Sequence, residues 1–237
     1  MDKTEQFIAI VPAAGVGKRM KAHCPKQYLR IQNKTILYHT VMKLLSHPLI
    51  TKVIIALSDN DQYFSESGLA DKKDIILVTG GVERVDSVLS ALKAVDVSTY
   101  PWVLVHDAAR PCLSLGDIDK LIRQCRDSDC GGILAVPVRD TMKRGTCAKG
   151  GVNTVDSTVE REQLWHALTP QLYKTDELTH SIELALANDL NITDEASAIE
   201  QANLPSLLVT GSSENIKITQ PSDLLLAEFY MNKQLVS

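Results

Sequence analysis

The sequence predicts an α/β fold, a single domain over residues 1–237 with a mostly parallel central sheet, helices on both faces and a projecting β-arm. Two observations lead to this prediction. Apolar runs of strand length alternate along the chain with segments whose apolar residues repeat at helical spacing. In addition, 237 residues of which 44% are hydrophobic are enough to build one sizeable core.

Each predicted strand is a short apolar run of a kind that can be buried on both faces. Pro12 ends the first of these runs, and polar or glycine-containing turns follow the others. A short segment, 215–219, is also strand-like. The predicted strands of the sheet are 7–11, 53–57, 75–79, 102–106, 133–137 and 207–210.

Helices are predicted where apolar residues recur three and four positions apart. Thr175 and Thr193 can cap two of them, and Asp194 and Glu195 suit the positive end of a helix dipole. In chain order, the apolar faces consist of Leu37, Val41, Leu44 and Leu45; Val85, Val88, Leu89 and Leu92; Ile118, Leu121, Ile122 and Cys125; Leu178, Ile182 and Leu186; and Leu225, Phe229 and Met231.

The pattern changes between residues 140 and 164, where there is no helical period and little to bury. Gly150 and Gly151 lie between two polar stretches rich in Thr and Val, which favours a hairpin or extended arm that projects from the domain. A flexible surface loop is the alternative interpretation.

Composition excludes several classes of protein. The net charge is −4, from 25 basic and 29 acidic residues, which argues against a general nucleic-acid binder. No apolar run is long enough to span a membrane, and no secretion signal is recognisable. The five cysteines are odd in number and contain no Cys-x-x-Cys, so we expect reduced thiols and a cytoplasmic protein.

The loop after the first strand predicts a phosphate site. Small residues there allow backbone N–H groups to approach a bulky anion, and several cations surround the same turn. A Walker A loop and a Gly-x-Gly-x-x-Gly fingerprint are both absent. We interpret the nearby Cys24 as an inert small residue. The small residues are Pro12, Ala13, Ala14, Gly15 and Gly17, and the cations are Lys18, Arg19, Lys21 and Lys26.

Three further charged or glycine-rich turns, 80–84, 106–111 and 137–141, also follow predicted strands. Ligands of open parallel sheets bind at this edge. Asp107 lies where a carboxylate could hold the Mg²⁺ of a triphosphate. The alternative is that Asp107 only caps the next turn or pairs with Arg110.

Two isolated cations are weaker candidates. Lys217 lies inside the strand-like segment, where a charge is costly unless it faces a partner. Lysines in such places are commonly edge residues that prevent aggregation. Arg161, in the arm, could equally be an ordinary solvated arginine.

The run Pro-Ala-Ala-Gly-x-Gly-x-Arg-Met, followed by Cys-Pro-Lys-Gln-Tyr, resembles the loop of sugar-phosphate nucleotidyltransferases. With VLVHDAARP, PVRDTMKR, LWHALTPQ, ITDEASA and NIKIT, the chain resembles the 2-C-methyl-D-erythritol 4-phosphate cytidylyltransferases of non-mevalonate isoprenoid synthesis. The resemblance implies a Rossmann-like enzyme that joins CTP to methylerythritol 4-phosphate with Mg²⁺ and releases pyrophosphate. It also implies a homodimer whose arms reach the partner's active site.

The same resemblance implies roles for individual residues. Arg19 and Lys26 match the pair that stabilises the transition state, where charge develops on phosphate oxygens. Arg161 and Lys217 match residues that position methylerythritol phosphate, and Arg110, Thr141 and Thr169 match others that line the same pocket. The matching CTP contacts are Pro12, Ala13, Ala14, Gly15, Gly17, Gly81, Ser87 and Ala108.

One departure and two alternatives remain. Val82 stands where close relatives are expected to carry an acidic residue, so a side-chain contact to the nucleotide is lost or is made by the backbone. A transferase acting on another polyol phosphate, such as ribitol 5-phosphate, would share the CTP loop. A non-catalytic nucleotide-binding regulator would need neither Lys26 nor Lys217.

Overall fold

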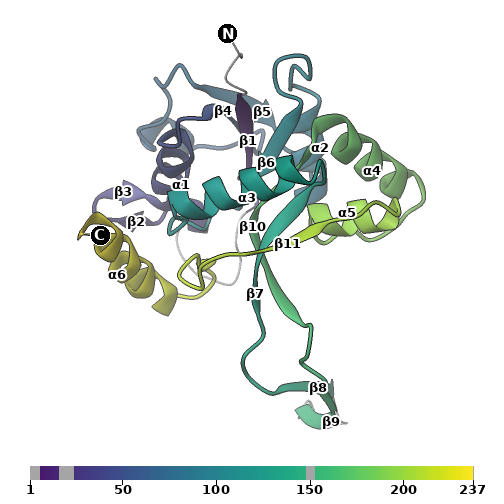
Figure 1. The fold of residues 1–237 in the computed structure, drawn as a ribbon. Helices are drawn as coiled ribbons and strands as arrows, with labels where there is room; N and C mark the ends of the chain where they lie inside the picture. Colours follow the sequence, from purple (N-terminus) through teal and green to yellow (C-terminus); the bar gives the residue numbers. More distant parts are fainter. Residues whose placement is uncertain (1–5, 16–23, 148–152, 237) are drawn as a thin grey trace.

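The computed structural model describes residues 6–15, 24–147 and 153–236. A seven-stranded sheet runs through its middle, in the order β11-β7-β10-β6-β1-β4-β5 (Figure 1). All neighbouring strands are parallel except that β10 is antiparallel to both β6 and β7. The predicted mostly parallel sheet is therefore confirmed. Its strands are β1 (Phe7–Pro12), β4 (Ile50–Leu57), β5 (Ile75–Thr79), β6 (Trp102–Val105), β7 (Gly132–Pro137), β10 (Trp165–Lys174) and β11 (Leu207–Thr210).

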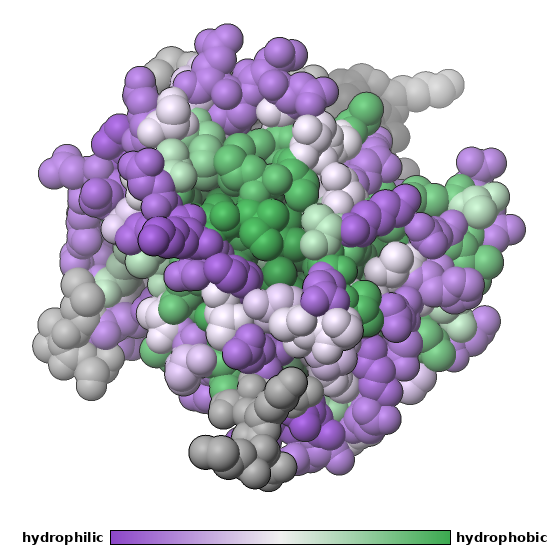
Figure 2. Space-filling model, turned by 90° about the horizontal axis from the view of Figure 1, so that it is seen from above, coloured by the Kyte–Doolittle hydropathy of each residue, from purple (hydrophilic) through white to green (hydrophobic). Residues whose placement is uncertain are grey.

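Helices cover both faces of the sheet, as predicted. Successive side chains of β1 point to opposite faces of the sheet, and both faces are apolar and need cover. Phe7, Ala9 and Val11 belong to one hydrophobic cluster, and Ile8 and Ile10 belong to another. Seen from above, hydrophobic side chains occupy the middle of the face and hydrophilic ones surround them (Figure 2). The first cluster includes α1 (Ile36–Leu45) and α3 (Leu115–Asp127); the second includes α2 (Arg84–Leu92), α4 (Thr175–Ala187) and α5 (Glu195–Gln201).

The sequence pattern does not predict strand β10, although β10 lies inside the sheet between β7 and β6. It contains Pro170 and polar residues such as His166 and Gln171, which obscure a strand pattern. The pairing of β10 with β7 shifts between Ala167 and Gln171, and Thr169 lies within this irregular stretch. A proline can be accommodated there because the ladder is already interrupted.

The arm is a real β-structure. Beyond β7 and β10, the strands β8 (Met142–Cys147) and β9 (Asn153–Val159) pair with each other in antiparallel register. Figure 1 shows this pair well separated from the main sheet. The predicted projecting β-arm is confirmed, and its β-pairing rules out the flexible-loop interpretation for these two strands.

The predicted C-terminal helix is present as α6 (Ser222–Val236) and packs through one small residue. Ala227 is fully buried in a third cluster with Ile31, Ile36 and Ile218, whereas Leu225 and Phe229 are 75% and 61% exposed. The small hairpin of β2 (Arg30–Ile31) and β3 (Lys34–Thr35) lies beside this helix.

Three local predictions also need correction. The N-cap of α4 is Lys174, and Thr175 is the first helical residue. The N-cap of α5 is Asp194 instead of Thr193, because the Asp194 carboxylate accepts the Ser197 N–H at 3.0 Å. Residues 215–219 are irregular, not a strand. Within the described ranges, every helix is too short or too polar for a membrane span.

Candidate active site

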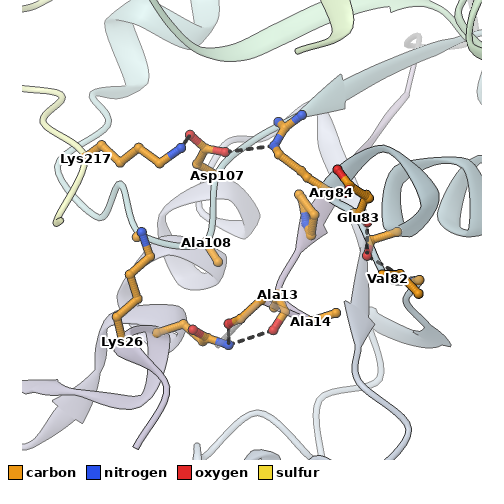
Figure 3. Close-up of a pocket in the computed structure, with 15 residues that line it drawn as sticks. Ala13, Ala14, Lys26, Val82, Glu83, Arg84, Asp107, Ala108 and Lys217 are labelled. Carbon is orange, nitrogen blue, oxygen red and sulfur yellow. Dashed lines mark hydrogen bonds and ion pairs between the residues drawn. The ribbon is translucent and has the colours of Figure 1, made fainter. Parts of the chain in front are cut away.

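A cavity of about 320 Å³ opens beyond the carboxyl ends of β1, β5 and β6 (Figure 3). This size suits a small-molecule ligand. Three of the four turns singled out in the sequence meet here, and the fourth, 137–141, leads into the arm. The lining residues are Pro12, Ala13, Ala14, Gly15, Lys26, Gln27, Gly81, Val82, Glu83, Arg84, Ser87, Asp107, Ala108, Ala109 and Lys217.

Gln27 shapes the first loop. It lies in the short 3-10 helix η2 (Lys26–Tyr28), is 3% exposed, and donates through Nε2 to the carbonyl oxygens of Ala13 (2.7 Å) and Gly15 (3.0 Å). A Cβ added at Gly15 would meet no atom within 4 Å, so the glycine leaves open space in the cavity. Gly17 and Arg19 lie outside the described residues.

The second turn is held by its own side chains. Ser87 Oγ accepts the Gly81 N–H at 3.1 Å and donates to the Glu83 carbonyl at 3.2 Å, so this buried hydroxyl shapes the turn. The Asp86 carboxylate accepts the Glu83 N–H at 2.9 Å in a capping box at the start of α2. Val82 is 99% exposed at the cavity rim and offers no polar side-chain contact.

Asp107 is the centre of a charged cluster. Its Oδ2 lies 2.9 Å from Lys217 Nζ, and its Oδ1 lies 3.3 Å from Arg84 Nε (Figure 3). The same Oδ2 lies 3.3 Å from Arg110 Nε. Arg84 also forms a bidentate ion pair with Glu195, in which Nη1 lies 2.6 Å from Oε1 and Nη2 lies 3.1 Å from Oε2. Burial raises the pKa of Asp107, but Arg84, Lys217 and Arg110 outweigh it and hold that pKa well below its usual range.

This arrangement does not fit the predicted magnesium contact of Asp107. Both carboxylate oxygens already face cations, which would repel a divalent metal at the same position. The geometry supports the alternative from the sequence, in which Asp107 pairs with Arg110, and adds two further cations to it.

A second cavity of about 130 Å³ adjoins the first, and Arg84, Asp107 and Lys217 line both. The charged cluster is therefore a wall between the two. Arg110 and Thr169 line only the second cavity, with further residues from β10 and the start of α5. A ligand on each side would have its charged end against the same set of cations.

Arg110 and Thr169 are held by the segment that carries Lys217. Arg110 Nη1 donates to the Asn215 carbonyl at 2.8 Å, and Asn215 Nδ2 donates to the Thr169 carbonyl at 2.7 Å. Two residues later Lys217 reaches Asp107. Residues 215–219 thus connect the loop after β6 to β10. A lysine is tolerated in this segment because its ammonium group faces the Asp107 carboxylate.

Lys26 lies across the first cavity from Arg84 (Figure 3). Its Nζ donates to the Ile218 carbonyl at 3.2 Å, so Lys26 contacts the residue that directly follows Lys217. Burial raises the pKa of the neighbouring Cys24 thiol, which disfavours a reactive thiolate and agrees with the inert interpretation.

The two predicted arm residues are not in either cavity. Thr141 and Arg161 are exposed, and an Arg161 guanidinium N–H donates to the Arg139 carbonyl at the base of the arm. Within one chain, therefore, the structure brings together Arg110, Thr169 and Lys217 of the predicted polyol-phosphate set and leaves Thr141 and Arg161 apart.

Sequence reasoning gave no role to Gln27, Arg84 or Glu195. Gln27 and Arg84 stand in segments that the sequence analysis singles out, so a role in the site could have been suspected for each. Glu195 was considered only for its effect on the helix dipole. Its 2% exposure and its pairing with Arg84 follow from packing. The sequence signal for this residue is its place in ITDEASA, one of the segments that carry the family resemblance.

Comparison with known proteins identifies the family to which the chain is similar. Residues 7–233 match the family model of 2-C-methyl-D-erythritol 4-phosphate cytidylyltransferase. The chain is 73% identical to the cytidylyltransferase of that name from Colwellia psychrerythraea, over 99% of this chain and 98% of the relative. It is 56% identical to the one from Vibrio vulnificus, over 96% of this chain and 95% of the relative.

Solved structures agree as well. A crystal structure of the Francisella tularensis 2-C-methyl-D-erythritol 4-phosphate cytidylyltransferase has a TM-score of 0.80 and 36% identity, covering 95% of this chain and 100% of the other. A crystal structure of 4-diphosphocytidyl-2C-methyl-D-erythritol synthase has a TM-score of 0.80 and 32% identity, covering 96% of this chain and 99% of the other.

Proposed function

The chain belongs to the 2-C-methyl-D-erythritol 4-phosphate cytidylyltransferase family, and from this premise we propose how its residues divide the reaction between them. The enzyme is a nucleotidyltransferase that joins CTP and 2-C-methyl-D-erythritol 4-phosphate in the isoprenoid pathway. A substrate phosphate oxygen attacks the α-phosphorus of CTP, and pyrophosphate leaves. What we propose concerns the location of each substrate and the role of each residue.

We place CTP in the first cavity and the polyol phosphate in the second. The observation that carries this assignment is the wall of Arg84, Asp107 and Lys217, which both cavities share. Two phosphorylated molecules repel each other, and cations between them allow their reacting ends to approach. The phosphate nucleophile is already an anion at neutral pH, so the reaction needs no protein nucleophile.

The cations have distinct positions relative to the reacting atoms. Lys26, together with the predicted Arg19, would stabilise the charge that develops on the α-phosphate and on departing pyrophosphate. Lys217 and Arg110 would bind the polyol phosphate from the other side. Asp107 keeps these cations in place through short contacts, and Glu195 does the same for Arg84. The small residues of the first loop and Ser87 shape the space for CTP.

Magnesium remains part of the proposal. Mg²⁺ retains much of its water and commonly binds substrate phosphates with few protein ligands. Because the surroundings of Asp107 do not fit a metal, we do not assign Mg²⁺ to this carboxylate. Bound together with CTP, the metal would offset negative charge on the triphosphate.

We further propose a homodimer in the cytoplasm in which the arm completes the partner's second cavity. Support comes from the projecting β8–β9 pair and from the position of Thr141 and Arg161 outside their own chain's cavities (Figure 1). An arginine fork is suited to a phosphate monoester. In this arrangement each second cavity takes Lys217 from one chain and Arg161 from the other.

Mixed dimers test the arm. Arg161→Ala and Lys217→Ala homodimers should both be nearly inactive. A heterodimer of the two variants contains one site with both substitutions and one site with neither. Purified heterodimers should therefore regain up to about half of the wild-type turnover, while mixtures that are not allowed to exchange subunits serve as the control. Absence of rescue in confirmed heterodimers would rule out a shared site.

Substrate choice is tested by pyrophosphate release from each of the four nucleoside triphosphates, with methylerythritol 4-phosphate or ribitol 5-phosphate as acceptor. We expect turnover with CTP and methylerythritol 4-phosphate. Faster turnover with ribitol 5-phosphate would favour the related polyol-phosphate transferase, and no turnover with any pair would favour a nucleotide-binding regulator.

A further inference from the structure

A buried histidine lies directly behind the second cavity. His106 directly follows β6 and is fully buried, with Nε2 3.0 Å from the Arg110 carbonyl oxygen and Nδ1 2.9 Å from Thr169 Oγ1. Thr169 Oγ1 also accepts the backbone N–H of Asp107 at 3.1 Å. These contacts join the loop after β6 to the irregular part of β10.

The contacts determine which ring nitrogen carries the proton. A carbonyl oxygen can only accept, so Nε2 must donate to Arg110. The groups that face the ring are Arg110, Asp107 and Thr169, and the carboxylate of Asp107 is already shared by three cations. A further positive charge on a fully buried ring is therefore disfavoured, and burial accordingly lowers the pKa of His106 to about 4. The neutral ring has its proton on Nε2, and Nδ1 is an acceptor.

The protonation of His106 determines which hydrogen bonds the Thr169 hydroxyl donates and which it accepts. Because Nδ1 accepts, the hydroxyl proton of Thr169 is committed to His106. One lone pair of Oγ1 is committed to the Asp107 N–H. The hydroxyl then has one lone pair left and no proton to donate. Thr169 lines the second cavity at 4% exposure, so this lone pair is the hydrogen-bonding capacity that its hydroxyl can offer a ligand.

We propose that His106 is a positioning residue that makes Thr169 an obligate acceptor, so that Thr169 recognises a hydroxyl group of the polyol. Phosphate oxygens at neutral pH are acceptors and would be repelled at this point. The phosphate end of the substrate is thereby directed away from Thr169 and toward Lys217 and the arm. This inference rests on the proposed location of the polyol phosphate in the second cavity.

The protonation pattern can be measured without any substrate. In ¹⁵N-labelled full-length protein, His106 should show a protonated Nε2 and an unprotonated Nδ1, unchanged from about pH 6 to about pH 8. The chain has six histidines, and the signals of His106 are those lost in His106→Asn. A protonated Nδ1, or a ring that titrates in this range, would overturn the inference whatever the enzyme's substrate.

Two substitutions separate the functions of the ring nitrogens. In His106→Asn the amide oxygen can take the place of Nδ1 and accept from Thr169, whereas His106→Gln can replace only the Nε2 donor to Arg110. We expect KM for methylerythritol 4-phosphate to stay within about threefold of wild type in His106→Asn and to rise about tenfold in His106→Gln, the loss of roughly one hydrogen bond. KM for CTP should change in neither.

If His106 had only a structural role, the two variants should give different results. If its purpose were to hold the Arg110 loop, His106→Gln would be the milder variant, or both would lower kcat and raise both KM values together. Either result would refute the positioning role. Melting temperatures of the two variants, measured in the same samples, identify any loss caused by unfolding. Wild-type turnover of CTP with methylerythritol 4-phosphate tests the proposed function separately.

Discussion

The substitution Glu195→Gln tests the charged wall directly. Glu195 is 2% exposed, lies in the first turn of α5, and binds both terminal nitrogens of Arg84. Arg84 is itself the only described contact of Asp107 Oδ1 among the ion pairs of this cluster. Removing the charge of Glu195 should therefore weaken the contact that positions Arg84 against Asp107, while the volume of the side chain stays almost unchanged.

The expected loss can be estimated from the contacts. Removing one partner of a buried ion pair costs about 3 to 5 kcal/mol. Here the cost is lower, because glutamine can still accept one hydrogen bond and Arg84 is 30% exposed and retains Asp107. A hydrogen bond to a charged group contributes about 1.5 to 3 kcal/mol, so we expect about 2 kcal/mol. For a chain of this length that is a fall in Tm of about 4 to 8 °C.

Unfolding in urea, followed by circular dichroism, measures the change. Glu200→Gln is the matched control, because Glu200 is exposed on the same helix and should alter the free energy of unfolding by no more than about 0.5 kcal/mol. If Glu195→Gln were as mild as this control, Arg84 would not depend on Glu195, and the ordered wall between the cavities would lose its physical basis.

Three further predictions concern the cavity and its support. Lys26→Ala should lower turnover by about 100-fold or more, measured as pyrophosphate release, since it removes a charge from the transition state; unchanged release would refute its assigned role. Burial lowers the pKa of His106 to about 4 in the folded protein from its ordinary value of 6.5, so the unfolded chain binds more protons between these pH values. The contribution of the neutral ring to the free energy of unfolding is complete above about pH 6.5 and should fall by about 2 to 3 kcal/mol when the pH is lowered to 4.5. Parallel urea titrations of wild type and His106→Asn measure this difference. Equal losses in both proteins would refute the lowered pKa of His106. Gly80→Ala would bring a Cβ to 2.7 Å from Ala14 Cβ and should raise KM for CTP, whereas Gly116→Ala meets no atom within 4 Å and should leave it unchanged. Equal KM values for CTP would show that the first loop tolerates the shift.

Much of the fold could be predicted from local patterns. The short apolar run of β1 and the helical period in α1, α2 and α3 depend on neighbouring residues, and both were predicted correctly. The central strand β10 could not be predicted in this way. Its polar residues and Pro170 disfavour a strand locally, and its place is determined by pairing with β6 and β7 on either side.

The sequence by itself determined which residue types were available to bind phosphate, because a glycine-bent loop with adjacent cations is a short-range feature. Only the tertiary structure decided what Asp107 contacts. Its partners Arg84, Arg110 and Lys217 come from three separate segments, and a buried carboxylate pairs with whichever cations packing brings to it. Burial and pairing are properties of the assembled chain, so a metal ligand and an ion-pair centre look the same until the surrounding segments are in place.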